Sequence, residues 1–239
     1  ILCKHLNLPI KIKNKKNYDE IKINKIKKIK KLNYNIPSDI SSSAFFIVLV
    51  ALTKNSKLIV KNVNINPSRI GIITILKKMG VKITFKNKKF YKGELVADIF
   101  VKGTKNLKAI NCPTELNSRS IDEFLLIFLV AAKAKGVSFF KNLGELNQKE
   151  SPRLKWGSQI LNLMGIKNNL TESSIKIFGN PKINIKKKII IKNYLKDHRI
   201  FMSSVIAGLS FGGEWHIHDK NSVNTSFPNF LKILKDLQK

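Results

Sequence analysis

The stretch that decides the fold is Asp122-Glu-Phe-Leu-Leu-Ile-Phe-Leu-Val-Ala-Ala-Lys-Ala134, in which an acidic pair opens an almost wholly apolar run. We interpret the run as a helix that is hydrophobic on all sides and must therefore be buried on all sides. Two other segments share this plan, because Asp39 precedes Ser41–Leu52 and Asp197 precedes Ile200–Phe211. The sequence thus predicts three central helices enclosed by other elements.

The segments after the three apolar helices also resemble one another. Each begins with a short strand and continues through a loop to a proline, which we expect at the first position of a second, amphipathic helix. The expected strands are Lys57–Val63, Val137–Asn142 and Glu214–His218; the prolines are Pro67, Pro152 and Pro228; the second helices are Ser68–Met79, Arg153–Met164 and Asn229–Leu237. Gly80 and Gly165 follow two of these helices as left-handed caps.

This internal repeat predicts an α/β fold of repeated units around buried helices. Its period of about 80 residues is too long for the usual solenoid repeats. Residues 1–35 fit the end of a further unit, with an outer helix over Ile1–Leu6 and a strand over Leu8–Lys13. We therefore expect residues 1–35 to be the remnant of an upstream domain, residues 36–239 to form one domain of three units, and Tyr34–Ser38 to be the hinge.

The composition of the chain excludes few functions. The chain of 239 residues carries 45 Lys plus Arg against 15 Asp plus Glu, a formal charge of +30. Such a charge favours anionic partners and keeps a basic nucleic-acid-binding module as one alternative, although a general bias toward Lys, Ile and Asn is the better explanation of the charge. The two distant cysteines indicate a reducing compartment, and no apolar run approaches the roughly 20 residues that span a bilayer. We expect a soluble, cytoplasmic protein without a membrane partner.

Two polar clusters are candidates for a functional site. The loop before the second outer helix carries Lys149 and Arg153, two cations that oppose the helix dipole unless an anion lies between them, with Ser151 as the expected cap. The third central helix begins with Asp197-His-Arg199, and an arginine at a helix N-terminus is suited to bind phosphate or carboxylate.

Six short motifs occur in order along the chain, and together they resemble the family of 3-phosphoshikimate 1-carboxyvinyltransferases, or EPSP synthases. They are Ser38-Asp-Ile-Ser-Ser-Ser-Ala-Phe-Phe46, Asn66-Pro-Ser-Arg69-Ile-Gly71, Ile121-Asp122, Lys149-Glu-Ser-Pro-Arg153, Asp197-His-Arg199 and Thr225-Ser-Phe-Pro-Asn-Phe230. The resemblance covers essentially the whole chain. It implies the enolpyruvyl transferase fold, with two similar domains each built from three βαβαββ-like units, and it implies that this chain is the C-terminal half.

The resemblance also implies an activity and three catalytic residues. The family transfers the enolpyruvyl group of phosphoenolpyruvate to the 5-hydroxyl of shikimate 3-phosphate and releases phosphate, in the pathway to chorismate and the aromatic amino acids. Asp122 matches the proton acceptor, which also contacts the shikimate ring. Lys149 matches a lysine shared by both substrates and able to donate a proton, and Glu150 matches an acidic residue implicated in proton transfer to the methylene carbon.

The remaining implied roles concern binding. Arg153 and Arg199 match arginines that hold the anionic groups of phosphoenolpyruvate, together with Lys149, and Glu145 lies at a shikimate 3-phosphate position. The chemistry implied requires neither a metal nor an organic cofactor. The implied partners are the two substrates and the missing N-terminal domain, within an enzyme that is monomeric at full length; alone, the chain would be inactive.

A related transferase that acts on UDP-N-acetylglucosamine shares the fold and remains an alternative, although Lys149-Glu-Ser-Pro-Arg153 and Ser226-Phe-Pro-Asn-Phe230 fit the shikimate enzyme better. A non-catalytic remnant is a further alternative. His216 and His218 share one face of a strand, but without a third ligand nearby we do not expect a metal site there.

Overall fold

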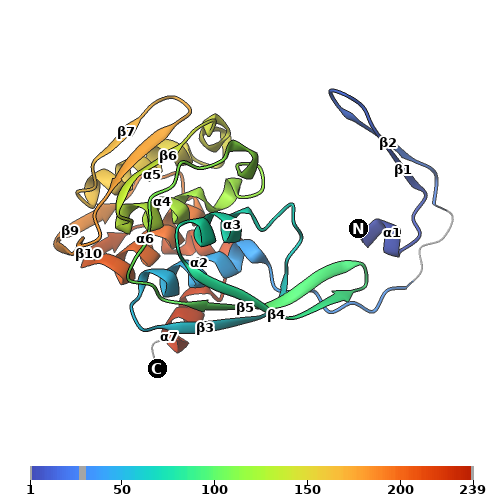
Figure 1. The fold of residues 1–239 in the computed structure, drawn as a ribbon, viewed down its shortest axis with the longest axis horizontal. Coiled ribbons are helices and arrows are strands. Elements are labelled where there is room, and N and C mark those ends of the chain that lie inside the picture. Colours follow the sequence, from blue (N-terminus) through green and yellow to red (C-terminus); the bar gives the residue numbers. More distant parts are fainter. Residues whose placement is uncertain (1, 27–30, 238–239) are drawn as a thin grey trace.

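A computed structural model describes residues 2–26 and 31–237, and it confirms the predicted α/β fold with buried central helices (Figure 1). The helices are α1 (Leu2–His5), α2 (Ile40–Leu52), α3 (Gly71–Lys78), α4 (Phe124–Lys133), α5 (Arg153–Leu163), α6 (His198–Phe211) and α7 (Phe230–Asp236). The strands are β1 (Ile10–Asn14), β2 (Asp19–Ile23), β3 (Lys57–Asn64), β4 (Lys82–Tyr91), β5 (Glu94–Lys102), β6 (Gly136–Phe140), β7 (Asn168–Leu170), β8 (Ile175–Gly179), β9 (Ile185–Ile191) and β10 (Gly212–Ile217).

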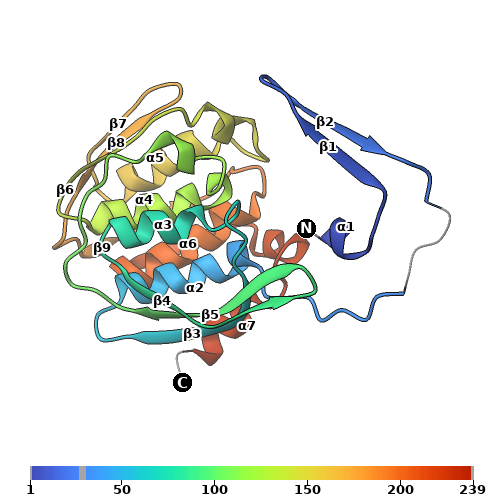
Figure 2. The same ribbon diagram turned by 45° about the vertical axis from the view of Figure 1, so that its right-hand side comes forward.

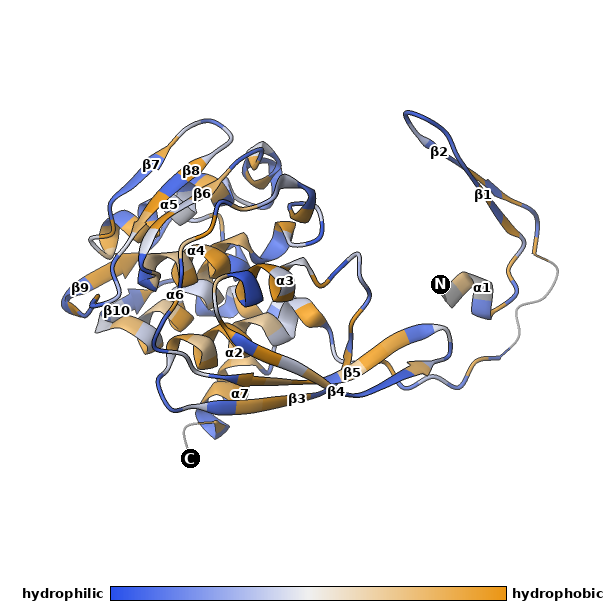
Figure 3. Cartoon of the chain, in the orientation of Figure 1, coloured by the Kyte–Doolittle hydropathy of each residue, from blue (hydrophilic) through white to orange (hydrophobic). Residues whose placement is uncertain are grey.

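The central helices α2, α4 and α6 run side by side in the same direction (Figure 2). Their first turns meet, because the Ser41 hydroxyl donates to Glu123 and the Arg199 guanidinium donates to the carbonyl oxygen of Asp122. Their last turns also meet, where the Lys133 ammonium donates to the carbonyl oxygen of Leu52. Figure 3 shows these helices as largely hydrophobic, in agreement with their burial. Three positive helix ends therefore point to one place on the molecule.

Three sheets surround the helices and follow the predicted repeat. The strand orders are β3-β5-β4, β6-β8-β7 and β10-β9. A parallel neighbour lies along the first strand of each unit: the single bridge of Ser38 to Val63 beside β3, two bridges from Lys108 and Asn111 beside β6, and the complete strand β9 beside β10. Within the described residues no strand follows α7, so the third sheet contains β9 and β10 alone. The units thus share one topology but differ in how many residues of the first strand pair with its parallel neighbour.

Close backbone contacts repeat as well. Gly103 follows β5, and a Cβ atom there would lie 1.9 Å from the carbonyl oxygen of Thr53 at the end of α2. Gly179 ends β8, and a Cβ atom there would lie 2.1 Å from the carbonyl oxygen of Ala134 just after α4. Two units therefore use a glycine to bring a strand end onto the C-terminus of a central helix.

The predicted role of the three prolines was wrong. Helix α3 begins at Gly71, because Asn66 first organises a turn in which its side chain accepts from the backbone N–H of Ser68. Helix α7 begins at Phe230, after a turn closed by the bond from its N–H to the carbonyl oxygen of Phe227. Pro67 and Pro228 thus occupy turns, where their fixed φ suits the second position.

At α5 the capping prediction was also wrong, because Pro152 is the N-cap residue and no side chain caps the helix. The hydroxyl of Ser151, expected to cap, donates instead to the Asp197 carboxylate at 2.8 Å. Asp39, by contrast, caps α2, because its side chain accepts from the N–H of Ser42. Gly80 and Gly165 have the positive φ angles expected of left-handed caps.

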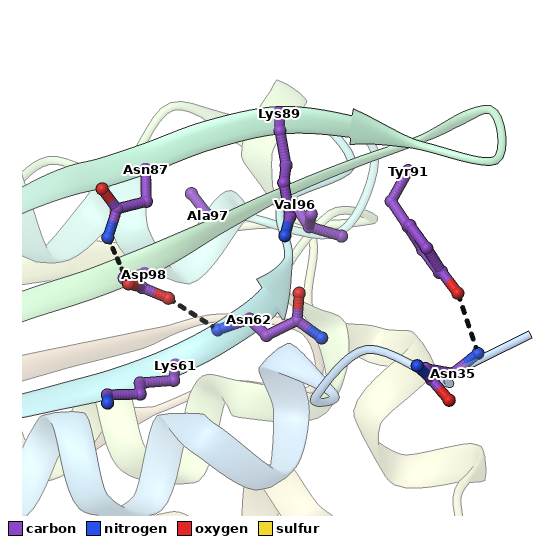
Figure 4. Close-up of a pocket in the computed structure, with 9 residues that line it drawn as sticks. All are labelled: Asn35, Lys61, Asn62, Asn87, Lys89, Tyr91, Val96, Ala97 and Asp98. Atoms are coloured by element: carbon purple, nitrogen blue, oxygen red, sulfur yellow. Dashed lines mark hydrogen bonds between the residues drawn. The ribbon is translucent and has the colours of Figure 1, made fainter.

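The N-terminal part contains α1 and the β1–β2 hairpin, which lies apart from the helical body in both views (Figures 1 and 2). The segment at the expected hinge is tied to the body. The backbone N–H of Asn35 donates to the Tyr91 hydroxyl at 3.0 Å, and the N–H of Ser38 donates to the carbonyl oxygen of Asn62. Figure 4 shows the first contact at the rim of a hollow of about 480 Å³ that is lined by residues of β3, β4 and β5.

Candidate functional site

The carboxylate of Asp122 lies at the centre of the candidate site. Three cations from two other segments of the chain surround it: Lys149 Nζ at 3.7 Å and Arg153 Nη1 at 3.4 Å from Oδ1, and Arg199 Nη2 at 3.9 Å from Oδ2. A short 3₁₀ turn, Ile121–Glu123, carries Asp122 beside the first turn of α4 rather than at its N-cap position. The side chain remains 27% exposed, so it faces solvent and can be reached by a ligand.

The spacing of Lys149 and Arg153 suggested an anion between them, and Asp122 is that anion in the folded chain. Lys149 precedes α5 and Arg153 opens it, so both cations lie at the positive end of the helix. The Asp122 carboxylate offsets this unfavourable charge, and Glu145 adds a second contact to Lys149 at 3.2 Å. Ion pairs therefore connect the loop before α5 to the start of α4.

Asp197 anchors Arg153 in the interior. Its Oδ2 atom accepts from Arg153 Nε at 2.8 Å and from the Ser151 hydroxyl, while Oδ1 accepts from the N–H of Arg199 and thereby caps α6. Burial alone would raise the pKa of Asp197, but the Arg153 charge and these hydrogen bonds outweigh it, so the pKa is lowered. Arg153 is only 2% exposed, and removing Asp197 would take away its one fully buried partner among the described residues.

Glu123 lies beneath the site, at the point where the three central helices begin. Its side chain is 3% exposed, it accepts from the Ser41 hydroxyl at 2.6 Å, and it lies 3.7 Å from Arg199 Nη1. Burial is the main reason that the pKa of Glu123 is raised, and Ser41 and Arg199 only partly oppose this effect. The residue connects α2, α4 and α6 below the surface of the site.

Two further groups complete the rim. Glu150 is half exposed and contacts Arg153 Nη2 from the bend before α5. His198 opens α6 between Asp197 and Arg199, and burial followed by the nearby arginine charges lowers its pKa despite the opposing effect of Asp197. Its imidazole is therefore neutral at pH 7.

The structure brings all six predicted site residues into one connected cluster. Asp122, Lys149, Arg153 and Arg199 are joined directly, and Glu145 and Glu150 join through Lys149 and Arg153. Sequence reasoning assigned no site role to Ser41, Glu123, Ser151 or His198. The only signal for them was their position next to a predicted residue or at the start of an apolar helix.

The hollow of Figure 4 lies elsewhere, because none of the six predicted site residues lines it. Across residues 2–26 and 31–237, no group of three His, Cys, Asp or Glu side chains could hold a metal ion. None of the helices in the described part of the chain combines the length and hydrophobicity that crossing a membrane requires.

Comparisons with known proteins identify the family of the chain. Residues 2–234 match the family model of EPSP synthase (3-phosphoshikimate 1-carboxyvinyltransferase). The chain is 42% identical over 202 residues to the 3-phosphoshikimate 1-carboxyvinyltransferase of Ruthia magnifica subsp. Calyptogena magnifica, and 40% identical over 204 residues to that of Thermodesulfovibrio yellowstonii. These matches cover 84% and 85% of the chain but 46% of each relative.

Solved structures give the same result. An EPSP synthase from Acinetobacter baumannii superposes with a TM-score of 0.87 at 36% identity, covering 98% of this chain and 53% of that one. The enolpyruvyl transferase NikO from Streptomyces tendae shares the fold, with a TM-score of 0.65 at 14% identity. The chain spans about half the length of the curated relatives it matches. It belongs to the EPSP synthase family.

Proposed function

We propose that this chain supplies half of the active site of an enzyme that transfers the enolpyruvyl group of phosphoenolpyruvate to the 5-hydroxyl of shikimate 3-phosphate, releasing phosphate. The observation that carries the proposal is the Asp122 carboxylate held among Lys149, Arg153 and Arg199. A base next to cations is what a poorly nucleophilic hydroxyl and two anionic substrates require.

The chemistry is divided among these residues as follows. Asp122 takes the proton of the 5-hydroxyl as that oxygen attacks the enol carbon. Lys149 or Glu150 delivers a proton to the methylene carbon, which gives the tetrahedral adduct. A proton is then removed from the resulting methyl group as phosphate leaves, and this restores the enol double bond. Arg199 and Arg153 hold the anionic groups of phosphoenolpyruvate, with Lys149 beside them.

On the other substrate, Glu145 and Lys149 contact shikimate 3-phosphate together with Asp122. The side chain of Glu145 is 63% exposed, so it is free to reach a hydroxylated ligand, and its contact with Lys149 holds both side chains on the same rim. The sister transferase acting on UDP-N-acetylglucosamine is disfavoured by the names of the curated relatives.

The charges of the cluster explain why half of the site is insufficient. Three cations, Lys149, Arg153 and Arg199, lie among the five acids Asp122, Glu123, Glu145, Glu150 and Asp197. Two substrates that each carry phosphate and carboxylate need more positive charge than this. We infer that residues 1–35 belong to an upstream domain, that residues 36–239 form the second domain, and that the upstream domain supplies the missing cations. The whole enzyme is proposed to be a cytoplasmic monomer.

Reconstitution tests this proposal. The chain is mixed with the separately produced N-terminal half of the T. yellowstonii relative, and phosphate release is measured with both substrates present. We expect turnover from the mixture and none from either half, because closure over both substrates needs both domains. Robust turnover by this chain alone would contradict the division of the site, and a mixture that binds neither substrate would contradict the function.

A further inference from the structure

The guanidinium group of Arg153 has two edges that can each bind a carboxylate with two hydrogen bonds. Asp197 occupies the edge formed by Nε and Nη2, with its Oδ2 atom 2.8 Å from Nε and its Oδ1 atom 3.3 Å from Nη2. This carboxylate is fully buried and also caps α6. The first edge therefore serves the fold and is unavailable to a ligand.

Two separate carboxylates cover the second edge, formed by Nη1 and Nη2. Asp122 Oδ1 lies 3.4 Å from Nη1, and Glu150 Oε2 accepts from Nη2. One oxygen from each acid thus takes the place that the two oxygens of a single ligand carboxylate would take. In this arrangement Arg153 offers no free edge to an incoming anion.

The two covering acids differ in how easily they can leave. Asp122 is also held by Lys149 and Arg199, and its backbone is fixed at the start of α4. Glu150 is 54% exposed on the bend before α5, and Arg153 is its only ion-pair partner among the described residues. Arg153 itself is 2% exposed, but the Glu150 carboxylate lies in water, so Glu150 can leave at small cost once a ligand carboxylate takes its place.

We propose that Glu150 is a displaceable internal counter-ion of Arg153, which covers the ligand-facing edge in the empty site and moves aside when the carboxylate of phosphoenolpyruvate binds. The inference rests on the proposed function and extends it. The displaced carboxyl group remains beside the bound ligand, where proton transfer is proposed. Glu150 thereby weakens binding of the ligand that it then helps to convert.

Titration of the whole chain with phosphoenolpyruvate tests the proposal. The binding of Glu150→Ala is compared with that of the unaltered chain by NMR, which measures weak binding. We expect Glu150→Ala to bind about two- to fivefold more tightly, since an ion pair with an exposed partner contributes up to about 1 kcal/mol and tenfold corresponds to 1.4 kcal/mol. Glu150→Gln should lie between the two, because its amide oxygen still accepts from Nη2 without the negative charge.

Glu115→Ala is the matched control, because Glu115 is an exposed acid outside the cluster. If Glu115→Ala bound phosphoenolpyruvate more tightly by the same factor, the change in net charge alone would explain the effect of Glu150→Ala, and the proposal would be overturned. Unchanged or weaker binding by Glu150→Ala, at a melting temperature equal to that of the unaltered chain, would overturn it too. In the reconstituted enzyme we expect Glu150→Ala to lower both the KM for phosphoenolpyruvate and kcat.

The same experiment separates this inference from the proposed function. If the unaltered chain binds phosphoenolpyruvate and the mixture turns over, but Glu150→Ala has the same affinity, the counter-ion proposal alone fails. If neither protein binds phosphoenolpyruvate and the mixture is inactive, both proposals fail. If only Glu150→Ala binds, the proposal is supported in its strongest form.

Discussion

Asp122 is the residue on which the proposed chemistry depends most directly. In the reconstituted enzyme we expect Asp122→Asn to lower kcat by about 10² to 10⁴, the usual effect of removing a positioned general base. Substrate binding should change less, because asparagine keeps the shape and one oxygen of the side chain. Single-turnover phosphate release and equilibrium titration measure the two effects separately. An unchanged kcat would remove Asp122 from the mechanism.

Asp197 illustrates the opposite role, in which a site residue stabilises the fold. Asp197→Asn removes the buried partner of Arg153 and should lower the free energy of unfolding by roughly 3 kcal/mol. Ser151→Ala removes a single hydrogen bond to the same carboxylate and should cost about 1 kcal/mol. Urea denaturation at pH 7 measures both. A loss for Asp197→Asn no greater than that for Ser151→Ala would show that the buried pair does not stabilise the chain.

The pH dependence of this stability has a definite sign. Because the pKa of Asp197 in the folded chain lies below its ordinary value of 3.8, the stabilisation is complete above that value. It is lost as the pH falls through the lower folded-state pKa. The difference in stability between the unaltered chain and Asp197→Asn should therefore be constant from pH 5 to pH 7 and shrink in acid below about pH 4.

At the scale of elements, glycines allow the end of a strand to pack against the C-terminus of a central helix. Gly179→Ala would place a methyl group 2.1 Å from the carbonyl oxygen of Ala134 and 2.6 Å from that of Ala131. Both contacts are with backbone, which cannot move aside as a flexible side chain can. We expect a loss of roughly 3 kcal/mol, at the upper end of the usual overpacking cost.

Gly165→Ala is the matched control for this element. Gly165 has a φ of +79° and no neighbour within 4 Å of a new Cβ atom, so the substitution adds only backbone strain, about 1 kcal/mol. The melting temperatures of the two variants show whether steric overlap, as at Gly179, or backbone strain, as at Gly165, costs more stability. If Gly165→Ala were the more damaging of the two, the interpretation of Gly179 as a close-approach position would fail.

At the scale of the whole molecule, the β1–β2 hairpin is the least covered part of the described chain. Ile12 and Ile21 pair across the strands on one face and are 54% and 61% exposed, whereas Lys11 and Lys22 lie on the other face. An exposed apolar hairpin favours self-association. We expect the double variant Ile12→Thr, Ile21→Thr to reduce association in sedimentation velocity, since a threonine pair preserves the strands.

The control changes the opposite face, through Lys11→Thr and Lys22→Thr. This variant should associate at least as strongly as the unaltered chain, because it removes charge and leaves the isoleucines exposed. Association that stayed constant in the isoleucine variant would show that another surface is responsible.

The charge of +30 also belongs to the whole molecule, and the structure accounts for part of its placement. Lysine side chains cover half-buried aromatic rings on the sheets; Lys141 and Lys176, for example, lie 4.8 and 4.9 Å from the centre of the Phe139 ring. Such contacts bury the aliphatic part of lysine and leave the charge in water. The basic composition therefore does not require a nucleic-acid partner.

The sequence by itself predicted the three apolar helices, the strand after each and the repeat that relates them, whereas the roles of the candidate site residues came from the resemblance of six short motifs to a known family. Hydrophobic periodicity and helix-start signals are local properties, so they can be recognised from the sequence alone. The start positions of α3 and α7 were misplaced, because Asn66 and the residues around Pro228 form turns whose hydrogen bonds compete with helix.

Only the tertiary structure decided how the charges pair. Asp197 and Arg153 are 44 residues apart, and Asp122 meets cations from two other segments, so no local pattern could reveal which acid lies beside which base. The sequence indicated two cations that lacked an anion; folding showed that Asp122 lies between them and that Ser151 turns away from its helix to reach Asp197. The physical reason is burial, because a charge removed from water must find a partner wherever the packed chain brings one.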